Sequence, residues 1–386
     1  MQTNSPRLKW IILFTAMLAF IAYIFAFQAV PPLMTSIVGE FHVTNAEAGL
    51  LMSVVLVPGI LLSIPISMVL NRYGVKLLGT IALIFVVLSS LVTAMATSFA
   101  IILVGRLILG IAASLVLIVM PTIVPQWFSR EELGKAMGVF TIGMPIATIV
   151  AFPTASALAM SYGWRYAFYV ALALGIVATI AYALVVKDGP MSIRGGALTG
   201  LSAFLSPEVW KIGIVWLFFT GSMMSFTTWA PTLLTKYKGF TPVEASFYAS
   251  LLSWISLFVV PVYGVLSDRM GKRKMFIVAG SLLLCLVEAA IAYSAEFILV
   301  ALIVALGLVS AMVPGNIQTL PSEILGPGKA SVGFAILGIC SNIGIATTQP
   351  LAGMIIDSTG SFSLAVLSMA AFAAACCASS LLIKSK

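Results

Sequence analysis

The chain has 386 residues, of which 61% are hydrophobic and only 8% are charged. A soluble domain carries about 25% charged residues, so this composition excludes an ordinary soluble protein. The net charge of +8 would suit a nucleic-acid partner, but the basic residues gather in a pattern that indicates membrane topology instead. We therefore expect a lipid bilayer around the chain and no nucleic acid.

Apolar runs of about 20 residues predict membrane-spanning helices, because lipid offers the backbone no hydrogen-bond partners. Twelve such runs follow one another, so we predict an all-α membrane protein. The expected spans are 10–34, 46–70, 76–96, 99–124, 135–160, 164–186, 210–234, 243–266, 275–294, 297–320, 330–356 and 362–383. The first run is longer than a signal-peptide core and lacks a small-residue cleavage site, so we expect it to be retained.

The basic residues predict the orientation of these spans. With the N-terminus inside, sixteen of the twenty Lys and Arg residues fall on cytoplasmic segments. Only Arg165, Lys236 and Lys238 fall outside, and Arg106 lies within a span. The positive-inside rule then predicts a multi-pass protein of the cytoplasmic membrane with both termini in the cytoplasm.

A short polar pattern precedes the second span and returns before the eighth. The chain has T-x-x-E-A at Thr44–Ala48 and again at Thr241–Ala245, an offset of 197 residues. Such a pattern before an apolar run is a capping box, in which Thr and Glu satisfy N–H groups at a helix start. The two spans are therefore predicted to begin at equivalent places on the outer side.

Two further matches follow in the same order. NRYG at Asn71–Gly74 matches DRMG at Asp268–Gly271, again at offset 197. GKAMGVF at Gly134–Phe140 matches GKASVGF at Gly328–Phe334 at offset 194. Together they predict two pseudo-symmetric six-helix bundles. We expect the bundles at 1–186 and 210–386, joined by a cytoplasmic linker loop at 187–209 that is rich in Gly, Ser and Pro.

At this point the sequence resembles a known family. GVLSDRMGKRK at Gly264–Lys274 is similar to the loop motif G-x-x-x-D-R-x-G-R/K-R/K of the major facilitator superfamily. The counterpart after the second span, Ser67–Lys76, is degraded, with Ser for the first Gly and Asn71 for the Asp. Val104–Ala113 resembles the family's fourth-helix motif, and Tyr162–Phe168 its entry to the sixth helix. The likeness implies a secondary transporter that works by alternating access, with the solute between the halves at mid-membrane.

The resemblance also implies a conformational latch. Asp268 would face the start of a helix in the opposite half, near Gly134, where a helix N-terminus favours an anion. Such a contact exists only while the cytoplasmic side is closed. Asn71 carries no charge, so the other half of the latch should be weaker. The alternative is a solvated loop that supplies only topology charge. The predicted latch residues are Gly264, Asp268, Arg269, Gly271, Asn71, Arg72 and Gly74.

Two ionisable residues lie inside predicted spans. Arg106, about 10 Å deep at 1.5 Å per residue, either attracts an anionic solute, helps a neighbouring acid release its proton, or is a structural residue bonded to backbone carbonyls or to the first span. Glu288 is the one acid clearly within a span. A proton-carrying role is open for it, but we favour a protonated group or one hydrogen-bonded to a neighbour.

Amides, hydroxyls and aromatic rings on cavity-lining spans can orient a small ligand without defining its charge. Each of them also suits simple helix–helix contact. The predicted substrate-binding residues are Tyr23, Gln28, Arg106, Thr122, Ser225, Thr228, Trp229, Asn316, Gln318, Asn342 and Gln349. Prolines are frequent within the spans, which suits helices that bend.

Other kinds of site find little support. The four cysteines all lie in apolar runs, and neither a metal spacing nor a cofactor motif is present, so we expect no metal and no cofactor. The single His lies in a loop, so a membrane enzyme is not expected. A nucleotide-binding loop is also missing, so a proton or solute gradient would supply the energy.

The solute is predicted as a small organic or inorganic anion. Trp127–Gly138 and Phe226–Leu234 are similar to segments of the superfamily's anion and organic-acid carriers, those for cyanate, nitrate or carboxylates. Export of neutral or lipophilic compounds is the alternative, because the interior holds little charge, although GMPIA at Gly143–Ala147 lacks the Gly-Pro pair typical of antiporters. A non-transporting sensor of the same fold is a further alternative. We expect a monomer.

Overall fold

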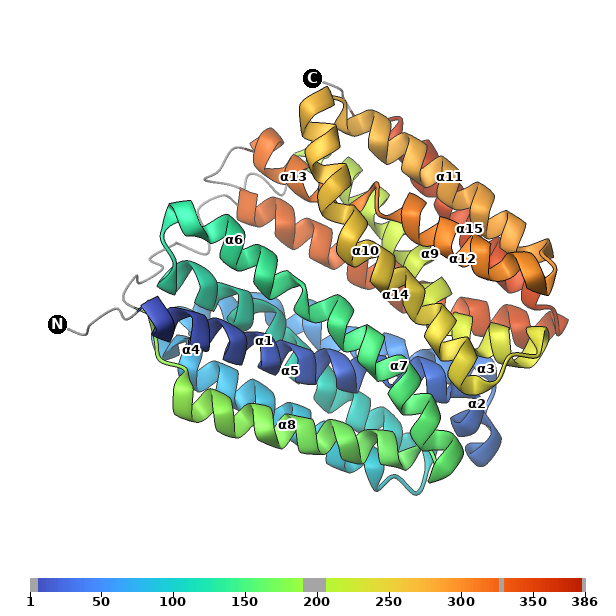
Figure 1. Cartoon of the computed structure of the whole chain (residues 1–386), viewed down its shortest axis with the longest axis horizontal. Coiled ribbons are helices and arrows are strands. Elements are labelled where there is room, and N and C mark those ends of the chain that lie inside the picture. The colour runs from blue at the N-terminus through green and yellow to red at the C-terminus, as the bar shows by residue number, and fades with distance from the viewer. Residues whose placement is uncertain (1–5, 190–205, 326–329, 384–386) are drawn as a thin grey trace. The chain divides into compact units, whose positions relative to one another are not determined.

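The computed structural model describes residues 6–189, 206–325 and 330–383, and these residues are almost entirely helical (Figure 1). Most of the predicted linker at 187–209, and Gly328 and Lys329 of the third repeat match, lie outside the described residues. Twelve helical stretches among the described residues are long and apolar enough to cross a membrane. The predicted fold class, an all-α membrane protein of twelve spans, is confirmed.

The backbone contacts divide the chain into two units. Unit 1 holds residues 1–36 and 54–197, and unit 2 holds 37–53 and 198–386. The predicted bundles, 1–186 and 210–386, stay a prediction, and the units differ from them in one segment. Residues 37–53 precede most of the first six spans in the chain, yet they pack within unit 2.

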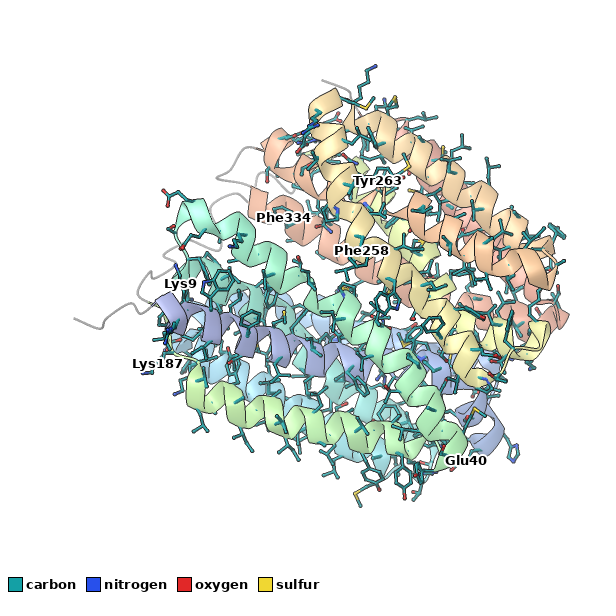
Figure 2. The ribbon with its side chains drawn as sticks, viewed as in Figure 1. Lys9, Glu40, Lys187, Phe258, Tyr263 and Phe334 are labelled. Carbon is teal, nitrogen blue, oxygen red and sulfur yellow. The ribbon has the colours of Figure 1, made fainter. Side chains whose placement is uncertain are left out.

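Unit 1 contains α1 (Pro6–Gln28), the start of α2 (Val30–Phe41), α4 (Leu56–Ala94), α5 (Phe99–Trp127), α6 (Arg130–Thr141), α7 (Gly143–Ser161) and α8 (Arg165–Val185). Within it, α4 packs along α5 and α8, while α1 packs against α5, α7 and α8. Lys9 and Lys187 lie at the same end of this unit (Figure 2). The predicted topology places both lysines in the cytoplasm, so it requires them to lie at the same end of the unit.

Unit 2 contains the end of α2, α3 (Asn45–Ser53), α9 (Pro207–Lys238), α10 (Pro242–Met270), α11 (Arg273–Tyr293), α12 (Glu296–Ser310), α13 (Pro314–Leu325), α14 (Ala330–Thr359) and α15 (Phe362–Ser380). In Figure 1, α11, α12 and α15 lie together on one side of this unit. The helix α14 packs along both α9 and α3.

Four of the predicted spans are broken, and each break comes just before a proline. The breaks fall at Ala29, Val54–Val55, Ile142 and Ala311–Val313, ahead of Pro31, Pro58, Pro145 and Pro314. A proline has no N–H for the carbonyl four residues earlier, and its ring clashes with that carbonyl. The expectation that prolines bend these helices therefore holds at these four places, whereas Pro121 and Pro153 lie inside continuous helices.

The two predicted capping boxes are both formed. The Glu47 N–H donates to Thr44 Oγ1 at 3.1 Å, and the Thr44 N–H donates to Glu47 Oε2 at 2.8 Å. The Thr241 N–H donates to Glu244 Oε2 at 3.0 Å in the same way. The helices α3 and α10 therefore begin at equivalent repeat positions, as the sequence predicts.

Close packing of α9 on α14 depends on small residues. A methyl group on Gly344 would lie 2.2 Å from the Leu217 carbonyl oxygen, which is a backbone atom that cannot rotate away. By contrast, nothing lies within 4 Å of the equivalent position on Gly338 of the same helix. Gly344 therefore sets the distance between the two helices.

We predict that Gly344→Ala separates α9 from α14 and lowers the free energy of unfolding by about 1–3 kcal/mol, the usual cost of overpacking. Gly338→Ala is the matched control and should be neutral or stabilising by up to about 1 kcal/mol through helix propensity. Thermal unfolding in detergent measures both. Equal melting temperatures for the two variants would contradict this account of the packing.

Candidate functional site

Arg106 is buried in unit 1 and holds the backbone of the first span. Its Nη1 donates to the Ala26 carbonyl at 2.9 Å, and its Nη2 donates to the Phe27 carbonyl at 3.1 Å. The guanidinium also lies 5.6 Å from the centre of the Phe27 ring, within the range of a cation–π contact. The alternative in which Arg106 ties its helix to the first span thus describes a contact that exists.

The chemistry of proline explains why the arginine binds there. In a continuous helix the Phe27 carbonyl would accept from the N–H of residue 31, but Pro31 has none. In a membrane no water is at hand to replace that donor, and an orphaned carbonyl costs several kcal/mol. Arg106 supplies the missing donor. The carbonyl contacts do not neutralise the positive charge of Arg106, and the predicted spans of unit 1 carry no Asp or Glu in their interior.

The other predicted substrate-binding residues of unit 1 lie on α1, the first span, and on α5, which carries Arg106. Tyr23 is buried and stacks on Phe27, with ring centres 6.3 Å apart. Gln28 Nε2 donates to Thr148 Oγ1 on α7 at 3.2 Å. Thr122 is half-buried and donates to its own helix, at the Ile118 carbonyl. Tyr23, Gln28 and Arg106 therefore gather where α1 ends, and Thr122 lies more than four turns further along α5 than Arg106.

Unit 2 brings the predicted residues of α9 and α14 together. Ser225 Oγ donates to the Thr348 carbonyl at 3.4 Å, and Trp229 Nε1 donates to the Gln349 carbonyl at 3.2 Å. Trp229 and Gln349 are both fully buried. These contacts join one face of α9 to α14 over more than a turn.

Several buried polar atoms of this region have no hydrogen-bond partner among the described residues. They are both side-chain atoms of the Gln349 amide and the hydroxyls of Thr228 and Thr232. A buried unsatisfied group costs about 1–3 kcal/mol, so each of them needs an explanation. A polar solute that reaches these groups in another state of the protein would supply the missing partners.

The remaining predicted residues are more dispersed. Asn316 is buried on α13, where its Nδ2 donates to the Met312 carbonyl at 2.8 Å and its Oδ1 has no partner among the described residues. Gln318 is exposed, and Asn342 is half-buried on α14. The predicted substrate-binding set as a whole stays a prediction.

Sequence reasoning missed two residues of these clusters. Thr148, the partner of Gln28, lies on α7, and Thr232 follows Thr228 by one helical turn on α9. The i, i+4 spacing of Thr228 and Thr232 places both on one helix face and could have indicated the second. Nothing in the sequence connects Thr148 with Gln28, because 120 residues separate them.

Glu288 is satisfied by a neighbouring helix. The carboxyl group is fully buried, and the Ser222 hydroxyl on α9 lies 2.7 Å and 2.9 Å from its two oxygens. The expectation that Glu288 is hydrogen-bonded to a neighbour is confirmed. Among the described residues no group of three His, Cys, Asp or Glu side chains is placed to hold a metal ion.

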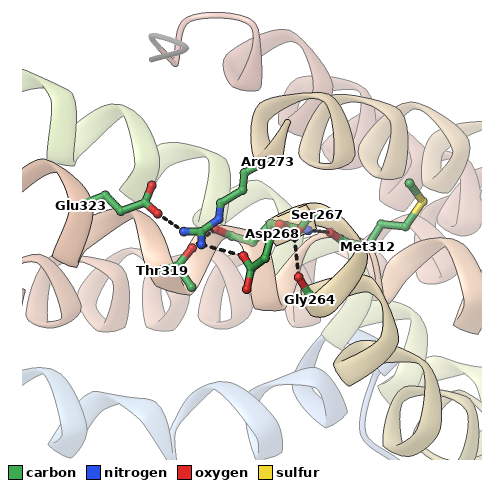
Figure 3. Close-up of polar contacts among 8 residues, drawn as sticks. Gly264, Ser267, Asp268, Arg273, Met312, Thr319 and Glu323 are labelled. Carbon is green, nitrogen blue, oxygen red and sulfur yellow. Dashed lines mark hydrogen bonds and ion pairs between the residues drawn. The ribbon is translucent and has the colours of Figure 1, made fainter. Parts of the chain in front are cut away.

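The intact loop motif forms a charged network at one end of unit 2 (Figure 3). Arg273 Nη2 donates to Asp268 Oδ1 at 2.6 Å, and Arg273 Nη1 also donates to Glu323 at the end of α13. One guanidinium therefore joins the ends of α10, α11 and α13. The predicted docking of Asp268 near Gly134 stays a prediction, since the observed partner of Asp268 belongs to its own unit.

Glycine is required in both copies of the motif. Gly271 ends α10 with φ of 62°, and Gly74 turns the chain within α4 with φ of 76°. Other residues rarely adopt this left-handed region. At the degraded copy, Asp188 Oδ1 accepts the Lys76 N–H at 3.1 Å, so an acid from beyond α8 binds the backbone just after this copy's glycine. Arg72 stacks on Tyr73, and Arg269 lies exposed in the last turn of α10.

Among the described residues, twelve membrane-capable helices, a repeated loop motif and buried polar clusters are the features expected of a multi-span membrane transporter. The family model described as Major Facilitator Superfamily matches residues 16–259 and 233–385. The chain belongs to this superfamily. The expected resemblance is thereby confirmed, and relatives of the chain are named as transporters.

The relatives include carriers named for anions. The chain is 24% identical over 266 residues to the nitrite extrusion protein of Bacillus subtilis, covering 68% of this chain and 67% of the relative. It is 28% identical over 273 residues to the probable nitrate/nitrite transporter NarK2 of Mycobacterium tuberculosis, covering 68% of each. It is 23% identical over 363 residues to the probable sulfoacetate transporter SauU of Cupriavidus necator, covering 84% and 82%.

Among solved structures, the chain is similar to a bacterial homolog of the human lysosomal transporter Spinster, crystallised in an inward-facing and unoccupied conformation. The TM-score is 0.82 at 17% identity, with 98% of this chain and 97% of that chain covered. This likeness supports the fold.

We predict that Arg273→Gln loosens the ends of α10, α11 and α13 together, because it removes both carboxylate contacts. The global cost should be small, about 1 kcal/mol, since exposed ion pairs are weak. Hydrogen exchange at 264–275 and 319–325 should rise. Lys211→Gln, which breaks the Lys211–Glu208 pair, is the control and should leave both segments unchanged. Faster exchange at 264–275 alone would show that Glu323 is not part of the network.

We predict that Gln349→Met raises the melting temperature of the solute-free protein, because it removes two unsatisfied buried atoms at similar volume. The gain should be about 1–3 kcal/mol. Gln318→Met, on an exposed position, is the control and should change little. A lower melting temperature for Gln349→Met would show that this amide has a structural partner.

Proposed function

We propose that this protein carries small anions, with nitrate or nitrite as the first candidates, across the cytoplasmic membrane by alternating access. The observation that supports it best is Arg106, a buried guanidinium in a unit whose predicted spans hold no interior Asp or Glu. A charge in the membrane interior is costly and is retained where it serves a function. An anion with several oxygens suits a planar guanidinium, which has five N–H donors.

The printed names of the relatives favour the same solute class. Nitrite, nitrate and sulfoacetate are all small anions, and the relatives named for them are 23% to 28% identical to this chain. The polar groups near Arg106, namely Tyr23 and Gln28, can donate hydrogen bonds to an oxyanion. A gradient of protons or of a second solute would supply the energy. The direction of transport follows from that gradient.

The proposed topology places both termini in the cytoplasm. Its support is the excess of Lys and Arg on the predicted cytoplasmic segments, sixteen against three. On this topology the Asp268 network lies at the cytoplasmic side, whereas the capping boxes of α3 and α10 lie at the outer side.

Export of a neutral compound is the second candidate. The unsatisfied groups of unit 2 are uncharged, and two of the Arg106 donors are used by backbone carbonyls. Uptake of labelled nitrate into proteoliposomes, with and without a proton gradient, separates the candidates. Saturable nitrate uptake above that of empty liposomes is expected. Its absence, under either gradient, would overturn the anion proposal and leave the neutral exporter or a non-transporting sensor.

We predict that Arg106→Gln abolishes the thermal stabilisation that nitrate gives to the purified protein, because an anion would enter a low-dielectric site without a countercharge. Pro31→Ala separately takes over one structural contact of Arg106, because it restores an N–H for the Phe27 carbonyl. Arg106→Gln should therefore lose nitrate stabilisation in both the parent and the Pro31→Ala background.

Arg165→Gln is the matched control, since Arg165 also donates to a backbone carbonyl, that of Ala96, at 2.8 Å. It lies at the start of α8 and should keep the full nitrate response. Recovery of nitrate stabilisation in the Pro31→Ala, Arg106→Gln double variant would assign Arg106 a structural role alone.

A further inference from the structure

A cavity of about 330 Å³ opens at one end of unit 2, where α9 and α11 end and α15 begins. Apolar side chains such as Ile291 on α11 form part of its wall. The polar part of the wall comes from Tyr237 and Lys238 in the last turn of α9 and from Ser361 and Ser363 at the start of α15. The cavity therefore combines an ammonium group and hydroxyls with an apolar surface.

Lys238 is half-buried at this cavity and keeps donors for a ligand. Its Nζ donates to the Ser294 carbonyl at 2.6 Å, which uses one of its three N–H donors. The other lysine of this turn, Lys236, is exposed and does not line the cavity. It lies 5.9 Å from the centre of the Tyr237 ring and close enough to Asp357 for the two charges to interact. The carboxylate nearby is thus matched by Lys236, and Lys238 is the lysine that serves the cavity.

The start of α15 adds a second attraction for an anion. The first N–H groups of a helix have no partner within it and carry partial positive charge. Ser361 is the N-cap of this 19-residue helix and accepts from the Leu364 N–H at 3.4 Å. Ser363 Oγ donates to the Ala292 carbonyl at 2.7 Å. Together with Lys238, this helix start favours a negatively charged group with several oxygens.

The cavity lies where membrane-spanning helices end, which is the level of the lipid headgroups. Tyr293, the last residue of α11, is 75% exposed, and tyrosine is enriched at the membrane–water interface. On the predicted topology this is the outer side, where Lys236 and Lys238 are two of only three basic residues. A phosphate group of the outer leaflet would therefore lie at the height of the cavity.

A strip of small side chains leads from the cavity along α15. Leu364, Ala371, Ala374 and Ala378 are all exposed, and their spacing of seven, three and four residues places them on one face of the helix. From Leu364 to Ala378 the strip is about 21 Å long, at 1.5 Å per residue. Alanine side chains let another chain lie close to the helix backbone. An apolar strip that starts at a cation and hydroxyls matches a lipid tail that starts at its headgroup.

We propose that this cavity binds the phosphate group of an anionic phospholipid of the outer leaflet, with one acyl chain along the small-residue strip of α15. Lys238 and the N-terminus of α15 neutralise the phosphate. The Ser361 hydroxyl, which accepts from Leu364, still has its own O–H to donate. The site lies within unit 2 and does not use Arg106, so it is separate from the proposed nitrate contact.

Thermal unfolding of the purified protein in detergent measures this binding, because a ligand of the folded state raises the melting temperature. The probes are phosphatidylglycerol, diacylglycerol with the same acyl chains, and inorganic phosphate. Phosphatidylglycerol should stabilise the parent protein. Diacylglycerol has no phosphate and should give little stabilisation. Inorganic phosphate has no acyl chain and should act only at far higher concentration.

Ser361→Asp reverses the charge of the cavity wall without removing the helix cap, because Asp is as good an N-cap residue as Ser. The apparent affinity for phosphatidylglycerol should fall roughly ten-fold or more, since like charges in contact repel each other. Ser98→Asp is the matched control. Ser98 caps α5 in the same way, by accepting from the Ile101 N–H at 3.4 Å, and does not line the cavity. This variant should respond like the parent.

The two lysines of the last α9 turn provide a second comparison. Lys238→Gln should lower the affinity for phosphatidylglycerol, whereas Lys238→Arg keeps the positive charge and should retain most of the response. Lys236→Gln removes the same charge two residues away and should bind like the parent, because Lys236 does not line the cavity.

Equal stabilisation of Ser361→Asp and the parent by phosphatidylglycerol would overturn the proposal, and so would an equal response to diacylglycerol. Loss of the response in Ser98→Asp as well would show a general effect of charge and would also overturn it. Inorganic phosphate that stabilises as strongly as the lipid, but not in Ser361→Asp, would keep the phosphate site and reject the lipid as its source. Because these assays contain no nitrate, their outcome does not depend on which solute is carried.

Discussion

The need of every backbone N–H and C=O group for a partner governs this structure more than any other constraint. Lipid offers no substitute, so helices form throughout and every interruption must be repaired. Four spans are interrupted ahead of prolines, and at the first of these breaks a side chain from another helix makes the repair. Arg106 supplies a donor to the Phe27 carbonyl that Pro31 leaves unpaired. Asp357 supplies acceptors to the Asn45 and Ala46 N–H groups at the start of α3.

The same constraint connects structure with function. A transporter has to break and remake contacts as it moves, and a broken span whose ends are held by another helix offers such contacts. The Asp357 contact with α3 consists of three hydrogen bonds at exposed positions. The Arg273 network at the end of α10 is of the same kind, because its members are partly exposed and exposed ion pairs are weak.

The interior polar groups divide by charge between the two units. Unit 1 holds the guanidinium of Arg106 with Tyr23 and Gln28, whereas the α9 and α14 pair of unit 2 offers hydroxyls and an amide. Amides and hydroxyls can orient a ligand without defining its charge. The unsatisfied atoms of Gln349 and Thr228 are consistent with a site that is complete only when solute is present. The Glu288 carboxyl group, by contrast, already has a hydrogen-bond partner in Ser222.

The sequence by itself determined the spans, the repeat and the family, because these depend on local properties. Hydropathy marks the twelve spans, T-x-x-E marks two helix starts, and DRMGKRK marks the loop motif. Only the tertiary structure decided the partners. Arg106 binds backbone carbonyls of the first span, Gln28 binds Thr148 and Asp268 binds Arg273. The packing of α3 on α14 was equally hidden, since 312 residues separate Asn45 from Asp357. The chemistry of a side chain determines how many hydrogen bonds it can make. Which group becomes its partner depends on how distant helices pack.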